Sequence, residues 1–193
     1  QATTNETNST IKTYLDNWYG ANIHNTKYKD YISDTLFCND RQLQSEVGGA
    51  ATGTGFGHSA TNYASYYRLN TNKTPSLFCG LKNDRFTVSN VSIGNGALTY
   101  PVGLITIDEL SLAGMVYNIS NSTNYLYTNQ CNWSMSPYCK GSSSTAYVWF
   151  VLPSGDLRDL DVDETCEVRP TINLKPNTIV TGYGDPTNPY VVQ

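Results

Sequence analysis

The stretch AYVWFVLPSGDLRDLDV, residues 146–162, carries the strongest fold signal in this chain. It opens with a run of apolar residues that ends at Leu152. The next four residues, Pro-Ser-Gly-Asp at 153–156, are the types that favour a turn. A second run follows, in which apolar and charged residues alternate. The stretch therefore predicts a β-hairpin of two antiparallel strands.

Trp149 lies at the centre of this hairpin, and its orientation matters most for function. Neighbouring residues of a strand face opposite sides of a sheet. Val148 and Phe150 therefore compete with Trp149 for the interior, and we predict that Trp149 faces outward. The alternative is that Trp149 is an ordinary core residue.

A helix is predicted over residues 10–19, in the stretch TIKTYLDNWYG. Its apolar residues recur at the spacing that places them on one helical stripe. Ser9 or Asn8 can cap the start of this helix, and Gly20 can end it. The polar residues 1–8 before it predict a flexible N-terminal segment.

A second, short helix is predicted over residues 107–113. Thr106 and Glu109 have the spacing of a capping box, and Gly114 can end the helix. Residues 168–174 resemble a last core strand. Two helices packed on an antiparallel sheet make an α+β fold, which we expect to form a single domain over residues 1–193. The side chains predicted to be buried are Leu15, Trp18, Leu110, Trp133, Val168 and Ile172.

Composition and charge exclude some partners. Charged residues make up 15% of the 193 residues, the net charge is −4, and Lys and Arg form no run. Nucleic-acid binding normally needs a concentrated cationic surface, so we expect no nucleic-acid partner. No apolar stretch approaches the roughly 20 residues that span a bilayer. Because the chain starts with Gln1 rather than Met, we interpret it as a processed product that contacts a membrane only through a missing N-terminal segment.

Tyrosine dominates the aromatic residues, with 15 Tyr against 5 Phe and 3 Trp. Tyr combined with Ser, Gly and Asn is typical of antibody-like recognition surfaces, where rigid rings make contacts and small polar residues adapt. An ordinary extracellular β-rich protein would also have such a composition. The aromatic content therefore allows a binding function without demanding one.

The five cysteines predict an exported, oxidised protein. No CxxC pair occurs, and the only histidines are His24 and His58, so zinc or thioredoxin-type chemistry and a catalytic triad are poorly supported. The tripeptide Asn-Asp-Arg follows a cysteine twice, at 39–41 and 83–85, and we draw no function from this repeat.

The stretch CNWSMSPYC at 131–139 places two cysteines around Trp133 and Tyr138. A disulfide between Cys131 and Cys139 would close a short loop around these aromatic residues. Alternatively, either cysteine could pair with Cys166.

The stretch DLDVDE at 159–164 alternates acidic and apolar residues. On a strand, Asp159, Asp161 and Asp163 would share one face. Clustered carboxylates can bind calcium, but the spacing and the glycine of an EF-hand are missing. Acids on the outer face of a half-buried strand explain the same pattern, so we assign no metal and no other cofactor.

Several segments together resemble a bacterial family of unknown function from gut Firmicutes. That family is related to the formylglycine-generating-enzyme-like variant of the C-type lectin fold. The C-terminal half of the resemblance lies in YLYTNQCNWSMSPY, AYVWFVLPSGDLRDLDV, CEVRPTINL and GDPTNPYVV. Its N-terminal half lies in TIKTYLDNWY, SDTLFCNDR, TNKTPSLFC, NDRFTV and GNGALTYPVGLITIDE, so the resemblance covers nearly the whole chain.

This resemblance implies a C-type lectin-like fold. It also implies a disulfide between Cys38 and Cys79, because both lie in family-like segments. The catalytic cysteine pair of formylglycine-generating enzymes has no convincing match here, so we expect no enzymatic activity.

The same fold hosts the variable proteins of diversity-generating retroelements, which keep a rigid scaffold and vary side chains on the last strands and loops. The corresponding region here runs from about Gln130 to Glu167, where Glu167 replaces the usual glycine. We expect a surface-displayed, extracellular ligand-binding or adhesion module that recognises a protein or glycan on another cell or surface. A structural pilin-like subunit and, less well supported, a formylglycine-generating-type enzyme are the alternatives. The predicted binding face consists of Tyr138, Trp149, Arg158, Asp159, Asp161 and Glu167.

Overall fold

The computed structural model describes residues 7–51, 60–141, 145–185 and 187–193. His58 and residues 1–6 of the predicted flexible segment lie outside this range. The helices are α1 (Thr10–Tyr19), η1 (Gly20–His24), η2 (Lys27–Tyr31), η3 (Gln44–Val47), α2 (Ala64–Tyr66), η4 (Tyr67–Asn72), η5 (Lys82–Asp84) and α3 (Ile107–Leu112). The strands are β1 (Phe37–Cys38), β2 (Thr61–Asn62), β3 (Arg85–Phe86), β4 (Asn132–Lys140), β5 (Ala146–Val151), β6 (Leu157–Asp161), β7 (Val180–Thr181) and β8 (Val191–Val192).

The main sheet has the strand order β2-β4-β5-β6, and all of its pairs are antiparallel. The predicted hairpin forms its β5–β6 pair, with Trp149 opposite Asp159. Gly155 adopts a φ of 81° in the connecting turn, where a residue with a side chain would be strained. In β4 the register shifts at Pro137, which has no N–H to donate to a ladder.

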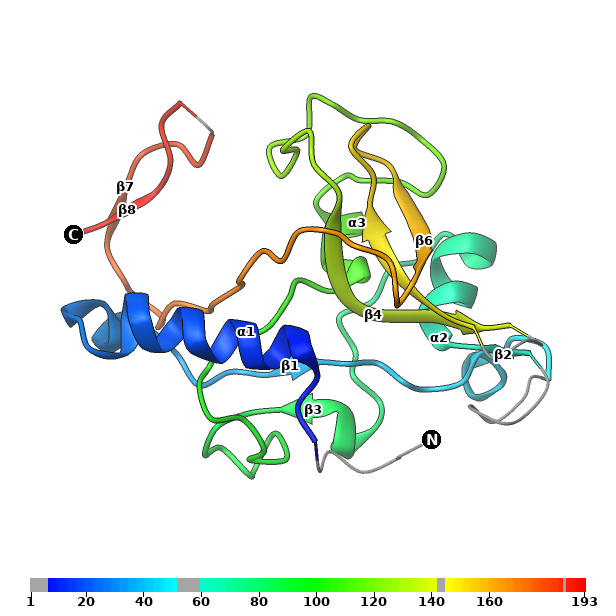
Figure 1. Cartoon of the computed structure of the whole chain (residues 1–193), viewed down its shortest axis with the longest axis horizontal. Helices are drawn as coiled ribbons and strands as arrows, with labels where there is room; N and C mark the ends of the chain where they lie inside the picture. The colour runs from blue at the N-terminus through cyan, green and yellow to red at the C-terminus, as the bar shows by residue number, and fades with distance from the viewer. Residues whose placement is uncertain (1–6, 52–59, 142–144, 186) are drawn as a thin grey trace.

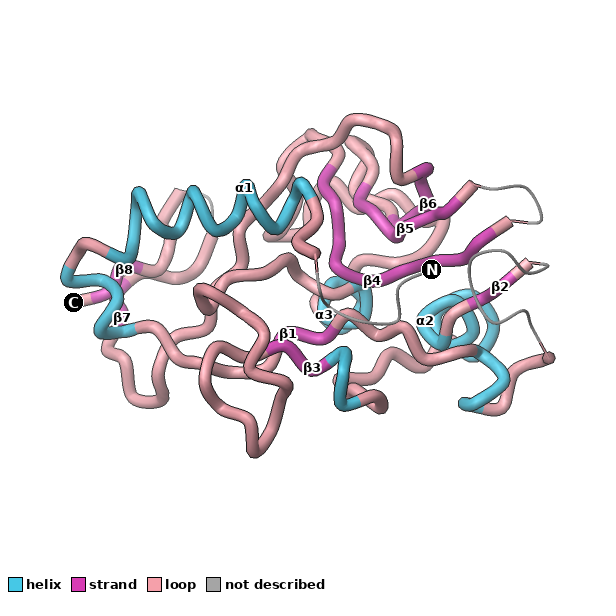
Figure 2. The backbone as a smooth tube through the Cα atoms, turned by 60° about the horizontal axis from the view of Figure 1, so that its bottom comes forward, coloured by secondary structure: helices cyan, strands magenta, loops and turns pink. Residues whose placement is uncertain are grey.

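Helices cover both faces of this sheet. On one face, Trp149 and Leu157 pack in a cluster with Leu69 of η4 and with Ile107 and Leu110 of α3. A second cluster, on the opposite face, joins Leu15 and Tyr19 of α1 to Trp133 and Phe150. Figure 1 shows the order of these elements, and Figure 2 shows α1 on one side of β4–β6 with α2 and α3 on the other.

Both predicted helices are confirmed, and their caps explain where they start. The Ser9 side chain accepts a hydrogen bond from the Lys12 amide at the start of α1. Gly20 does not end the helical path, because a π-helical turn continues to His24. At α3, Thr106 and Glu109 form the predicted capping box.

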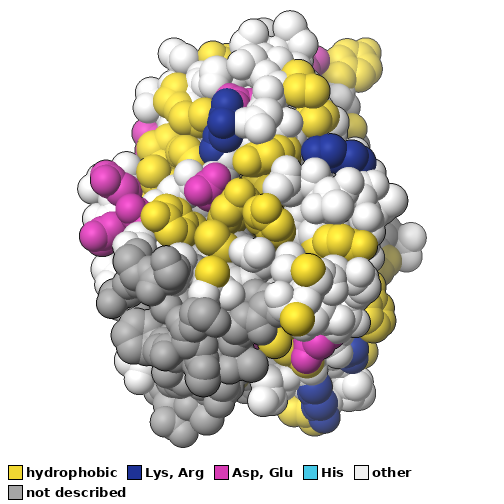
Figure 3. All heavy atoms as spheres, turned by 90° about the vertical axis from the view of Figure 1, so that its right-hand side faces the viewer, with side chains coloured by type: hydrophobic (Ala, Val, Ile, Leu, Met, Phe, Trp, Pro, Cys, Tyr) yellow, Lys and Arg dark blue, Asp and Glu magenta, His cyan; other side chains and the backbone are white. Residues whose placement is uncertain are grey.

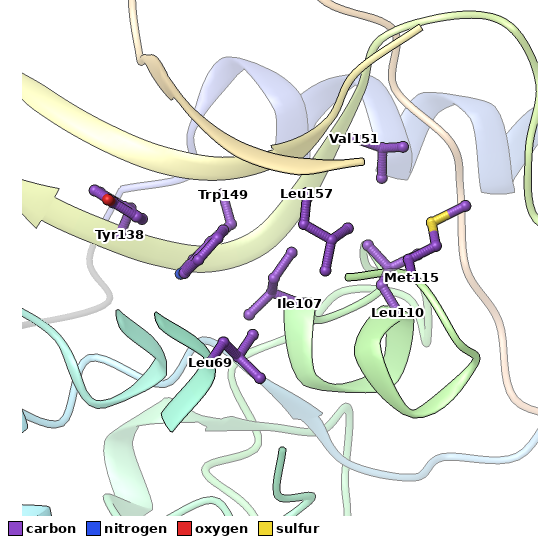
Figure 4. Packing of buried hydrophobic residues seen from close by; sticks show 8 residues of the cluster. All are labelled: Leu69, Ile107, Leu110, Met115, Tyr138, Trp149, Val151 and Leu157. Carbon is purple, nitrogen blue, oxygen red and sulfur yellow. The ribbon is translucent and has the colours of Figure 1, made fainter. Parts of the chain in front are cut away.

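The predicted outward orientation of Trp149 is wrong. Its side chain is 0% exposed, and its indole Nε1 donates a hydrogen bond to Ser65 Oγ at 3.1 Å. Tyr138 and Tyr117 contact the indole edge-to-face, with ring centroids 4.7 and 5.5 Å from it. Figure 4 shows Trp149 among the buried side chains between the sheet and the helices. The prediction failed because helices cover both faces of the sheet. Successive residues of β5 therefore point into two different buried layers, and not alternately into the core and into solvent.

The other predicted core residues divide into two groups. Leu15, Leu110 and Trp133 are buried, as predicted. Trp18, Val168 and Ile172 are only half-buried. All three pack against the hydrophobic cluster beneath α1.

Residues 168–174 do not form the predicted strand. They make two isolated bridges, Gly103 with Thr171 and Ile32 with Leu174. Pro170 lies inside this segment and cannot donate to a continuous ladder. The architecture confirms the α+β class, whereas the C-type lectin-like fold and the single domain over 1–193 stay predictions.

Replacing Trp149 with alanine should destabilise the protein by about 3–5 kcal/mol, because the change removes a fully buried indole and leaves a cavity. Urea unfolding followed by circular dichroism would measure the loss. Tyr183, which is 83% exposed, supplies the control: Tyr183→Ala should stay within about 0.5 kcal/mol of the unmodified protein. Equal stability of the two variants would contradict the buried position of Trp149.

Candidate binding surface and ligand cavity

Two disulfides hold segments that are distant in the sequence. The predicted Cys38–Cys79 bond is present, with a Cα–Cα distance of 5.9 Å. The predicted Cys131–Cys139 bond is wrong, because Cys131 pairs with Cys166 and Cys139 is free. Cys131 directly precedes β4 and Cys139 lies near its far end, so an extended strand separates them by more than about 20 Å, far beyond disulfide reach. Two disulfides indicate an oxidising, extracellular type of environment.

The six residues of the predicted binding face do not form one exposed surface. Tyr138 and Trp149 are buried in the core. Asp159 pairs with Trp149 across the ladder, so its side chain starts on the same inward face. Arg158 lies on the opposite face, and its Nε donates to the Asp156 carboxylate at 2.8 Å. Asp161 is half-buried, whereas Glu167 and the Arg158 side chain, which is 43% exposed, are the members of the predicted set that reach solvent.

The acidic end of β6 creates an unusual environment around the free thiol. Burial, and secondarily the neighbouring charge of Asp161, raises the pKa of Asp159. Burial, reinforced by the charge of Asp159, raises the pKa of the Cys139 thiol to about 11. The predicted row of three acids is broken, because β6 ends at Asp161 and Asp163 lies beyond it. No three His, Cys, Asp or Glu side chains converge as a metal site within the residues that the structure describes.

Two loops with exposed residues lie at the ends of the predicted region, residues 125–131 and 163–169, and the hairpin turn adds Pro153 and Ser154 between them. Besides the disulfide between Cys131 and Cys166, backbone hydrogen bonds join the two loops: the Glu167 amide donates to the Cys131 carbonyl at 3.0 Å. The Arg169 Nη1 donates to the Leu126 carbonyl at 2.8 Å. The exposed residues around this junction are called here the stapled loop surface, and they are Tyr125, Thr128, Asn129, Gln130, Thr165, Glu167 and Arg169.

A cavity of about 160 Å³ lies elsewhere, between β1, η4 and the start of α3. Leu36, Phe37 and Leu104 give it an apolar wall. Leu77 and Phe78 also line it, and both are strongly exposed, at 67% and 69%. The cavity is therefore apolar on one side and bordered by two hydrophobic side chains that remain in contact with solvent.

Four charged side chains line this cavity, together with uncharged polar residues such as Thr106, Ser136 and Asn173; the charged ones are Asp40, Arg68, Asp108 and Glu109. The first three form one network. Arg68 makes a bidentate contact to Asp108, with its Nε 2.9 Å from Oδ1 and its Nη2 2.6 Å from Oδ2. The same Nη2 donates to Asp40 Oδ2. Asp108 Oδ1 also accepts the Ser76 amide at 2.8 Å, which holds the segment beside Leu77 in place. Asp108 lies in the first turn of α3, where a negative charge is favourable.

Within this network, Asp40 has an unsatisfied hydrogen-bond acceptor. The residue is 5% exposed, and its Oδ1 is buried with no hydrogen-bond partner. Burial raises the pKa of Asp40, and the negative charges of Asp108 and Asp84 add to this effect, while Arg68 opposes it. For Arg68 itself, burial alone would lower the pKa, but the two carboxylates raise it above its ordinary value.

Sequence reasoning missed this cavity. Asp40, Arg68 and Asp108 lie 28 and 40 residues apart, and none stands in a recognisable motif. One signal was present: each repeated Asn-Asp-Arg tripeptide contributes an aspartate that pairs with an arginine. Asp40 of the first repeat binds Arg68, and Asp84 of the second accepts from the Arg41 Nε at 2.7 Å.

Comparison with known proteins adds no relative. No protein-family model matches the chain, and neither a curated protein nor a solved structure matches it significantly. In the described part of the chain, no helix has the length and apolar character needed to cross a membrane. On the face of the molecule near α2 and β2, hydrophobic side chains lie between scattered charged ones (Figure 3).

Alkylation of the unreduced protein should modify Cys139 alone. In the native state the reaction should be slow at about pH 8, where a thiol of pKa about 11 is only about one thousandth thiolate, the reactive form. Its rate should rise about tenfold per pH unit up to about pH 10 and should jump on unfolding in urea. Mass spectrometry of the labelled peptides measures this, with Cys139→Ala as the unlabelled control. Labelling of Cys131 or Cys166 without reductant would contradict the assigned pairing.

Proposed function

We propose that this protein is a surface-displayed, extracellular binding module that recognises a protein or glycan on another cell or surface. The stapled loop surface is the site that supports this proposal. It combines a tyrosine, amide side chains and both charge types, which is the residue usage of adaptable recognition surfaces. It also retains Glu167 from the predicted binding face.

The observation that carries the proposal is the covalent and hydrogen-bonded junction beneath these loops. Cys131–Cys166 and the Glu167–Cys131 backbone pair tie both loops to the start of β4. Loops held in one arrangement lose less conformational entropy when they bind, so more of the contact energy contributes to affinity. A scaffold with exposed, variable side chains on fixed loops also fits the proposal that the region 130–167 is diversified between strains.

Diversification would leave a specific pattern in the gene. Among alleles from many strains, we expect amino-acid substitutions to concentrate at Gln130, Thr165 and Glu167, whose side chains can change without disturbing the core. Trp149 and Tyr138, although they lie in the same region, should remain unchanged because they are buried. Sequencing the locus tests this. Substitutions spread evenly over exposed residues of the whole chain would contradict diversification.

Direct binding can be tested with fluorescently labelled protein on glycan arrays and on intact bacterial and epithelial cells. Tyr125 is 58% exposed on the stapled loop surface, and Tyr125→Ala should weaken binding about tenfold or more, since exposed tyrosines supply much of the contact energy of such surfaces.

The matched control for this experiment is Tyr183→Ala, which removes a tyrosine from outside the loop surface and should leave binding unchanged. Equal loss in both variants would contradict the assignment of the site. Filament assembly without binding to any array or cell would instead favour the structural pilin-like subunit.

A further inference from the structure

We propose that the cavity beside Asp40 binds a primary ammonium group carried on an aliphatic stem, as at the end of a lysine side chain. This site is separate from the stapled loop surface and does not depend on the function proposed for it. The proposal rests on the charge balance of the network, on one unpartnered oxygen and on the apolar lining.

The charge balance of the network favours a cation. Two carboxylates, Asp40 and Asp108, share a single guanidinium, that of Arg68. Both carboxylates are less than one tenth exposed, so solvent screens their excess negative charge poorly. A ligand that brings one positive charge would balance the three groups, whereas an anionic ligand would be repelled by two carboxylates.

The unpartnered oxygen specifies a hydrogen-bond donor. Asp40 Oδ1 has no partner in the structure, while Oδ2 of the same carboxylate is bound by Arg68. Buried carboxylate oxygens are normally satisfied, because leaving one without a donor is unfavourable by about 1–3 kcal/mol or more. Oδ1 itself is buried, and Asp40 is one of the residues that line the cavity. An ammonium group supplies both the donor and the charge.

The lining defines what carries the ammonium. Leu36, Phe37 and Leu104 line one side of the cavity with hydrocarbon, along which a methylene stem can lie, while residues such as Thr106, Ser136 and Asn173 add hydrogen-bonding groups elsewhere. The volume of about 160 Å³ is below the roughly 300–1,000 Å³ of pockets that enclose drug-sized ligands. The cavity therefore suits one side chain, with Leu77 and Phe78 exposed at its border to contact the rest of the ligand.

Titration of the 15N-labelled protein with Nα-acetyl-lysine amide tests the proposal by NMR. Saturable shifts are expected at the amides of Asp40, Ser76 and Asp108. Nα,Nε-diacetyl-lysine amide, which keeps the stem but loses the charge, should bind at least tenfold more weakly. Glucosamine, which carries its ammonium on a hydroxylated ring, should also bind more weakly than the lysine derivative.

Two pairs of variants locate the site. Asp40→Asn removes the excess charge and should weaken lysine binding at least tenfold, while Asp163→Asn, an exposed acid outside the cavity, should not. Leu77→Lys places a competing ammonium at the cavity border and should also weaken binding, with Leu77→Gln as its uncharged control. Because Leu77 is exposed, this second pair remains informative even if Asp40→Asn does not fold.

Three outcomes would overturn the inference. The first is an absence of saturable shifts at the cavity amides. The second is equal binding of the diacetylated compound or of glucosamine, which would remove the requirement for an ammonium or for an aliphatic stem. The third is unchanged lysine affinity in a folded Asp40→Asn or in Leu77→Lys.

Discussion

Burial of Trp149 is the interaction around which the two halves of this chain are joined. The residue lies in β5, yet its partners come from three other segments: Ser65 from α2, Tyr117 from a loop and Tyr138 from β4. Ser65 in turn donates to the Pro137 carbonyl, at the point where the register of β4 shifts. One indole therefore fixes both the packing of α2 on the sheet and the environment of the irregular strand, since its N–H must find an acceptor once it is buried.

The strands of the N-terminal half are short, and polar and covalent contacts stabilise this part of the chain. The pair β1–β3 is only two residues long on each side. The Cys38–Cys79 bond lies beside it, and Arg68 links the segment after β1 to α3 through Asp40 and Asp108. Asp34 adds a further tie by accepting the amides of residues 88–90, and these hydrogen bonds lower its pKa although burial opposes them. A buried network of this kind is sensitive to the loss of any one partner, because the remaining charge would be left uncompensated.

The two candidate sites follow from this division of the molecule. The sheet is covered on both faces and offers little side-chain surface, so the binding that we propose is assigned to the loops at its ends. Those loops are held by the second disulfide, which joins Cys131, just before β4, to Cys166 in the chain after β6. The cavity arises where the polar N-terminal half meets α3, and its acidic residues come from segments that only the fold brings together.

The sequence by itself determined the local elements: the caps of α1 and α3, the β5–β6 hairpin with its glycine turn, the α+β class and the presence of disulfides. These features depend on interactions between residues that are close in sequence, such as Thr106 and Glu109, so a sequence pattern can predict them. Only the tertiary structure decided that Trp149 is interior, that Cys131 pairs with Cys166 and that Asp40, Arg68 and Asp108 meet. Alternation along a strand says which residues share a face but not whether a helix covers that face, and cysteine spacing cannot show which thiols come within bonding distance. Both depend on contacts between residues far apart in the chain, which packing alone establishes.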